Sequence, residues 1–139
     1  MTKLFATIAV FAALVIPNWV SAMQPSCNQM TGMWKNQLGS TLSIKSIDTQ
    51  TGGITGTYRS PSGTAGNDYP LIGWINSKVS IPEKHNVTAI TFSVRWNEHG
   101  TITSWTGYCD NSGGTTAITT MWHLVDPVSR FSWDHILTG

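Results

Sequence analysis

Charged side chains are scarce in this chain of 139 residues. Lys and Arg together number 8 and Asp and Glu number 7, so charged residues make up 11% of the chain and the formal net charge is +1. A typical globular chain has about a quarter of its residues charged. The sequence has no basic cluster that could follow a phosphate backbone, which argues against a nucleic-acid partner.

The sequence also lacks an apolar run long enough to span a membrane, which takes about 20 residues. Its one long run, from Leu4 to Ile16, follows Lys3 and precedes the small residues Val20-Ser21-Ala22. This order is typical of a secretory signal peptide. We expect residues 1–22 to be a signal cut after Ala22, with an uncleaved anchor as the alternative. Residues 23–139 would then form a single domain, secreted to an extracellular or periplasmic space and not bound to a membrane.

Cysteine is limited to two positions, Cys27 and Cys109. In an exported chain these two residues are expected to form a disulfide, because the compartment is oxidising. The cross-link would stabilise the fold by roughly 4 to 5 kcal/mol in the chain-entropy model. The histidines show no metal-ligand spacing, so no metal site is predicted; they are His85, His99, His123 and His135.

After residue 26 no segment shows a convincing helical period. Short stretches of alternating apolar and polar residues recur instead, separated by Gly, Pro, Asn and Ser clusters. The pattern predicts an all-β domain. The expected strands are Gly32 to Asn36, Ser40 to Ser46, Ile54 to Ser60, Leu71 to Ser77, Ala89 to Asn97, Thr101 to Cys109 and Thr116 to Leu124.

Tryptophan is abundant, with seven residues in the chain. Alternation along the strands groups three of them with the following neighbours on one face: Trp96 with Ile90, Phe92 and Val94; Trp105 with Thr101 and Thr103; Trp122 with Ile118, Thr120 and Leu124. A hydroxyl buried without a partner costs about 1 to 3 kcal/mol, so indoles and hydroxyls together are unusual in a closed core. We interpret this face as a pocket for an amphipathic small ligand, with a packed sandwich core as the alternative. Ile102, Met121 and Val125 would point outward and suggest subunit contacts.

Five segments occur in a distinctive order: W-K-N-Q-L-G-S at Trp34 to Ser40, T-G-T-Y at Thr55 to Tyr58, F-S-V-R-W at Phe92 to Trp96, S-W-T-G at Ser104 to Gly107 and T-M-W-H-L at Thr120 to Leu124. Together they resemble the avidin and streptavidin family of biotin-binding proteins, from about Cys27 to Gly139. The resemblance implies an eight-stranded antiparallel up-and-down β-barrel with one ligand per subunit. It also implies a Cys27–Cys109 disulfide like that of avidin.

The resemblance further implies a role for individual residues. Asn36, Ser40 and Tyr58 would donate hydrogen bonds to the ureido oxygen of biotin, as fixed donors in a dry pocket. Ser60 would accept from a ureido N–H, Thr103 would face the ring sulfur and Thr101 the valeryl carboxylate. The remaining ligand-binding positions are Leu38, Trp96, Trp105, Trp122 and Leu124, most of which would wall the bicyclic ring. As alternatives, Asn36 or Ser40 would only cap a turn, and Tyr58 would bond to a backbone carbonyl.

Trp133 lies where this family has a tryptophan that reaches into a neighbouring subunit's pocket. The resemblance therefore implies a homo-oligomer, with a tetramer favoured over a dimer and a local lid as the alternative for Trp133. The eighth strand, from about Asp134 to Gly139, is expected to be short. Glu98 and His99 follow Trp96 where the family has more neutral residues. Glu98 would repel a ligand carboxylate, and a protonated His99 would attract it. As the alternative, both are solvated loop residues.

The sequence thus predicts a secreted binder of biotin or biotinylated molecules that sequesters the vitamin, without catalysis and without a cofactor. A lipocalin-like carrier of another hydrophobic ligand is the alternative. A hydrolase is disfavoured, because the chain has no G-x-S-x-G motif and its acidic residues are scattered. Asn86-Val87-Thr88 fits the N-glycosylation sequon.

Overall fold

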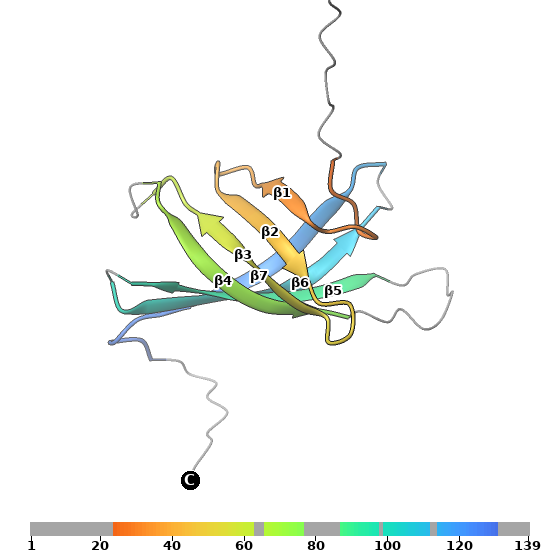
Figure 1. Ribbon diagram of the computed structural model, residues 1–139. Coiled ribbons are helices and arrows are strands. Elements are labelled where there is room, and N and C mark those ends of the chain that lie inside the picture. Colours follow the sequence, from red (N-terminus) through yellow and green to blue (C-terminus); the bar gives the residue numbers. More distant parts are fainter. Residues whose placement is uncertain (1–23, 63–65, 77–86, 98, 112–113, 131–139) are drawn as a thin grey trace, which may run out of the picture.

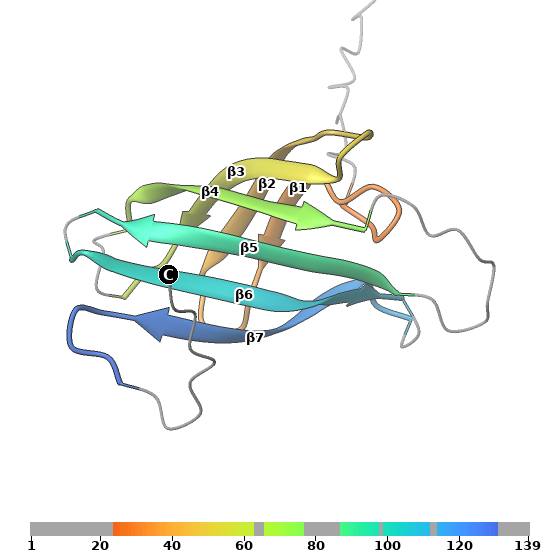
Figure 2. The same ribbon diagram turned by 90° about the horizontal axis from the view of Figure 1, so that it is seen from below.

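The protein is an antiparallel sheet curled into an open half-barrel (Figure 1, Figure 2). The computed structural model describes residues 24–62, 66–76, 87–97, 99–111 and 114–130. Within them, each strand pairs with the next along the chain, in the order β1 to β7. The strands are β1 (Gly32–Lys35), β2 (Thr41–Ile47), β3 (Gly53–Arg59), β4 (Asp68–Ile75), β5 (Thr88–Trp96), β6 (Thr101–Asp110) and β7 (Ala117–Val125). The all-β, up-and-down prediction is confirmed.

Strand β4 differs most from its predicted bounds. It begins at Asp68, three residues before the expected Leu71, and includes Pro70. Proline has no N–H to donate and is normally confined to strand positions that need no donor. Residues 68–70 pair only with β3, because the register with β5 begins at Leu71 opposite Val94. The predicted eighth strand, Asp134 to Gly139, and the predicted signal at residues 1–22 lie outside the described residues.

Glycines within the strands permit the close approach of neighbouring backbones in this curled sheet. A Cβ built on Gly107 in β6 would lie 1.9 Å from the carbonyl oxygen of Thr119 in β7. A Cβ on Gly73 in β4 would lie 2.0 Å from the carbonyl oxygen of Thr91 in β5. Glycine inside a strand commonly marks such a contact or a bend. Any other residue at these two positions would force the strands apart.

We expect Gly107→Ala to lower the free energy of unfolding by about 2 kcal/mol or more, because the added methyl group meets backbone and not a flexible side chain. Chemical denaturation of the ligand-free protein measures this change. Gly53→Ala is the matched control, since its Cβ would meet side chains and no backbone: the Thr51 hydroxyl at 3.2 Å and the Asp48 Cβ at 4.0 Å. Equal stability of the two variants would contradict the explanation that glycine at position 107 is needed for the close approach of β6 and β7.

The end of the half-barrel near the N-terminal segment is filled by apolar side chains and the disulfide. Cys27 and Cys109 are bonded, with their Cα atoms 5.4 Å apart, as predicted. The Trp34 indole N–H donates to the carbonyl oxygen of Met30 at 2.9 Å. Met30 itself is almost fully buried and belongs to one core cluster with inward side chains of the central strands: Ile44, Ile54, Leu71, Ile90 and Phe92. The segment 24–31 is thereby held against this end of the sheet.

The outer face of β5, β6 and β7 carries both hydroxyls and exposed apolar residues. The Ser93 and Ser104 hydroxyls hydrogen-bond across the strands at 2.7 Å. Ile102, Met121 and Val125 are exposed by 49%, 73% and 46%, in agreement with their predicted outward direction. Their role in subunit contacts remains a prediction. Among the described residues, none belongs to a helix of the length and apolarity that crossing a membrane requires.

Candidate ligand-binding site

A cavity of about 880 Å³ opens at the end of the half-barrel opposite the disulfide. The turns after β1, β3 and β5 surround this end, so residues distant in the sequence meet there (Figure 1). Of the predicted ligand-binding residues, all but Trp133 line this one cavity: Asn36, Leu38, Ser40, Tyr58, Ser60, Trp96, Thr101, Thr103, Trp105, Trp122 and Leu124. Trp133 lies outside the described residues.

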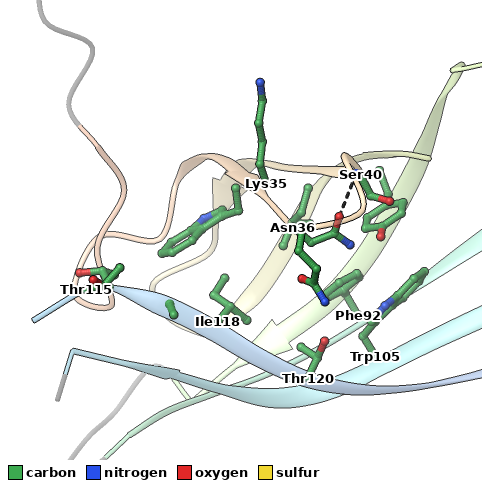
Figure 3. A pocket seen from close by; sticks show the side chains of 14 residues that line it. Lys35, Asn36, Ser40, Phe92, Trp105, Thr115, Ile118 and Thr120 are labelled. Atoms are coloured by element: carbon green, nitrogen blue, oxygen red, sulfur yellow. Dashed lines mark hydrogen bonds between the residues drawn. The ribbon is translucent and has the colours of Figure 1, made fainter. Parts of the chain in front are cut away.

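Asn36 holds the turn between β1 and β2 through its side-chain oxygen. Its Oδ1 accepts hydrogen bonds from the backbone N–H of Leu38 at 3.0 Å and of Ser40 at 2.9 Å, the latter drawn in Figure 3. The alternative interpretation, in which Asn36 caps a turn, is therefore right for its side-chain oxygen. An amide has a second, donating end. The Nδ2 group of Asn36 has no partner in the described part of the chain and remains available in the cavity wall.

Two hydroxyl groups lie beside this amide. Ser40 directly precedes β2 and is 7% exposed, and Tyr58 near the end of β3 is 9% exposed. Leu42 pairs with Tyr58 across the two strands, which places Ser40 and Tyr58 on the same inward face at neighbouring register positions. Neither hydroxyl has a hydrogen-bond partner within the described ranges. Both residues are mostly buried, but their unpaired hydroxyl oxygens are still reached from the cavity. Such donors favour an acceptor brought by a ligand.

An aromatic cluster that includes Tyr58 lies beside these donors. The Trp105 ring stacks on Phe92 with centroids 4.8 Å apart and planes at 12°, and it also contacts Tyr58 at 4.8 Å. The Trp96 indole N–H donates to the Thr103 hydroxyl at 2.7 Å, and both residues are buried. Because Thr103 accepts from the indole, its own O–H remains able to donate toward the cavity. The sheet thus provides flat apolar surfaces whose orientation is set before a ligand enters.

The wall formed by β7 is open. In β7, Trp122 pairs with Trp105 of β6 and Leu124 pairs with Thr103 of β6. The side chains of Trp122 and Leu124 therefore face the cavity. They are nevertheless 62% and 42% exposed, because β7 is an edge strand of the described sheet. A ligand bound against β7 would be covered on one side only by the described residues.

The cavity wall is almost free of charge. No Asp, Glu, Lys or Arg is among the described residues that line it, and His99 is its one imidazole. Arg59 stands in the chain between two lining residues but pairs with Asp68 instead. Its Nε lies 2.8 Å from Asp68 Oδ1, and this ion pair joins the strands β3 and β4. The hydrogen bond from Arg59 lowers the pKa of the exposed Asp68 carboxyl. Within the described ranges no three His, Cys, Asp or Glu residues gather as metal ligands would. The site therefore suits a neutral polar head with apolar faces.

A second hollow of about 370 Å³ adjoins the first and lies between β1 and β7. Figure 3 shows Asn36 and Ser40 on one side of it, Ile118 and Thr120 on the other, and Trp105 nearby. Alternation had already assigned Ile118 and Thr120 to this face. Gln37 and Ser62 also line the main cavity but had no signal in the sequence, since turn residues have no period. Thr119 lines the cavity as well, although alternation along β7 assigns it to the face opposite that of Ile118 and Thr120.

Comparison with known proteins accounts for this combination of fold and cavity. Residues 24–139 match the model of the Avidin family. The chain belongs to the avidin family. At the level of the family, these proteins are biotin binders without enzymatic activity.

Individual avidin-family proteins are similar over most of the chain. Avidin-related protein 4/5 of Gallus gallus is 34% identical over 126 residues, which cover 88% of this chain and 77% of that protein. Avidin of Gallus gallus is 32% identical over 126 residues, with the same coverage. The crystal structure of xenavidin superposes with a TM-score of 0.60 at 32% identity, covering 76% of this chain and 84% of xenavidin.

Proposed function

We propose that this protein is a secreted, high-affinity binder of biotin that sequesters the vitamin and catalyses no reaction. The observation that carries the proposal is the meeting of three donors without partners, Asn36 Nδ2 and the hydroxyls of Ser40 and Tyr58, beside an aromatic wall. The ureido oxygen of biotin is an acceptor able to take several hydrogen bonds. Once a ligand covers the site, donors whose positions are already fixed favour a polarised oxygen more strongly than donors left in water do.

The other lining residues suit the rest of the ligand. Ser60 would accept from a ureido N–H, and the free O–H of Thr103 would face the ring sulfur. Thr101 would contact the valeryl carboxylate. The apolar faces would cover the bicyclic ring without losing rotamer entropy of their own; they belong to Leu38, Trp96, Trp105, Trp122 and Leu124.

We further propose that the protein assembles into a homo-oligomer, with a tetramer favoured over a dimer. The open wall at Trp122 and the exposed outer residues Ile102, Met121 and Val125 support assembly, because each is apolar surface that a second subunit would cover. Trp133 would reach a neighbouring subunit's site. Ligand binding and assembly would then stabilise one another.

Thermal unfolding with increasing free biotin tests the proposed ligand. A ligand that binds only the folded state at about 1,000 times its Kd adds about 4 kcal/mol to the free energy of unfolding. We expect the midpoint to rise steeply up to one biotin per chain and slowly beyond. An unchanged midpoint at millimolar biotin would refute the proposal. A rise with a long-chain fatty acid instead would favour the lipocalin-like carrier, against which the three donors argue.

A further inference from the structure

Thr120 places a hydroxyl group on the β7 wall of the site. The residue is partly buried and lines both the 880 Å³ cavity and the adjoining 370 Å³ hollow. Figure 3 shows its side chain directed into the hollow, with Asn36 and Ser40 on the other side. The Thr120 hydroxyl has no hydrogen-bond partner among the residues that the structure describes. A hydroxyl oxygen accepts hydrogen bonds as well as donating one, so this group is available to a ligand as an acceptor.

A cyclic urea needs more from its site than donors for its oxygen. Its carbonyl oxygen lies between two N–H groups, which point to opposite sides of the carbonyl. In the proposed function the oxygen meets Asn36, Ser40 and Tyr58, and one N–H meets Ser60. An N–H that is covered by the protein without an acceptor costs binding free energy. The second N–H therefore requires an acceptor on the other side of the three donors.

The order of the strands places Thr120 on that side. Ser60 directly follows β3, so it lies beyond Tyr58 when the strands are followed from β1. The curl of the sheet brings β7 across the hollow from β1, and residues of both strands line this hollow. The donors, which come from the turn after β1 and from β3, are thus flanked by Ser60 at one end and by Thr120 at the other. A planar urea whose oxygen faces the donors directs one N–H toward each of them.

The other polar groups near this side are occupied or less fixed. Asn36 Oδ1 already accepts from two backbone N–H groups, and the Thr116 hydroxyl donates to Asn111 Oδ1 at 2.8 Å. Gln37 lines the cavity from an exposed turn, so a ligand would have to order its several rotatable bonds. Thr120 is β-branched and lies in a strand, which restricts its χ1 angle before a ligand enters. Its hydroxyl is the acceptor that costs least to position.

We infer that Thr120 is a specificity-determining residue whose hydroxyl accepts a hydrogen bond from the second ureido N–H. The inference rests on the proposed function, because it requires the ureido oxygen of biotin to meet the three donors. The site then selects a cyclic urea with both N–H groups free, and a substituent on the nitrogen that faces β7 removes the contribution of Thr120. Because the hydrogen bond joins two neutral groups, we expect it to contribute about tenfold in Kd.

Competition titrations of the full chain and of Thr120→Val test the inference with three ligands: biotin and its two isomers methylated on a single ureido nitrogen. Valine removes the hydroxyl and nearly keeps the shape of threonine. We expect Thr120→Val to weaken biotin about tenfold, and one of the two isomers by a similar factor. The other isomer has no N–H for Thr120, so both proteins should bind it equally. Thr120→Ser, which restores a hydroxyl, should bind biotin within about threefold of the parent.

Thr106→Val is the matched control. Thr106 lies on the outer face of β6, where its hydroxyl is 3.3 Å from that of Thr91, and it lines neither cavity. The control should bind all three ligands as the parent does. Thermal unfolding without ligand checks that Thr120→Val and Thr106→Val are folded to the same extent.

The outcomes separate this inference from the proposed function. A loss of biotin affinity below about twofold in Thr120→Val, or an equal loss for all three ligands, would overturn the role of Thr120 while leaving biotin binding intact. A tenfold loss in Gln37→Leu but not in Thr120→Val would assign the acceptor to Gln37 instead. Failure of the parent chain to bind biotin would refute the proposed function itself.

Discussion

Replacing Asn36 with Asp is expected to weaken biotin binding by a factor of about 100 or more. The carboxylate can still accept from the backbone N–H groups of Leu38 and Ser40, so the turn between β1 and β2 persists. The Nδ2 donor, however, is replaced by an anion that faces the ureido oxygen of the ligand. A buried donor–acceptor pair turned into two acceptors costs about 3 kcal/mol, and each 1.4 kcal/mol is a tenfold change in Kd.

Isothermal titration or a dissociation rate measures this loss. Asn111→Asp is the charge-matched control, because Asn111 lies in the turn between β6 and β7 and its Oδ1 accepts from Thr116 rather than lining the cavity. We expect its affinity to remain within about twofold of the parent, as for a surface substitution. If Asn36→Asp bound biotin as tightly as Asn111→Asp, the Asn36 amide would not be a ligand donor.

Removing the disulfide by the double substitution Cys27→Ser and Cys109→Ser is expected to have the largest effect on stability. The bond closes a loop with a sequence separation of 82 residues. In the chain-entropy model the loss is roughly 4.5 kcal/mol of free energy of unfolding, because the unfolded chain regains the freedom that the cross-link removed. Denaturant unfolding of the ligand-free protein, at one fixed protein concentration, measures the difference.

The same double variant separates stability from binding. Neither cysteine lines the cavity, so folded variant protein should bind biotin within about threefold of the parent at 25 °C. A reducing agent should destabilise the parent by a similar amount and leave the variant unchanged. A loss below about 1 kcal/mol would show that the segment 24–31 is held by packing around Met30 rather than by the cross-link.

Much of the site could be predicted because its residues sit on strands. Side chains alternate between the two faces of a strand, so Trp96, Trp105 and Trp122 could be assigned to one inward surface before any pairing was known. The roles of Asn36, Ser40 and Tyr58 came instead from the resemblance to the avidin family. The structure shows that these residues and the indoles line one cavity; the hydrogen bonds to biotin remain a prediction.

Turns and edges were less predictable, since their properties depend on neighbours distant in the sequence. Asn36 had two competing interpretations, as a turn cap and as a ligand donor, and the structure assigns the first to its oxygen while leaving its nitrogen available. The start of β4 at Asp68 depends on which neighbour pairs with Pro70. The exposure of Trp122 depends on the position of β7 at the edge of the sheet.

The sequence by itself determined the all-β class, the inward faces of β5, β6 and β7 and the pairing of Cys27 with Cys109, the only two cysteines in the chain. These features follow from local alternation and residue count, which need no knowledge of long-range contacts. Only the tertiary structure decided which donors remain unpaired, that β7 leaves its wall open, and that His99 joins the cavity. Each of these depends on how the curl of the sheet brings separate turns together, and alternation along a single strand carries no information about that curl.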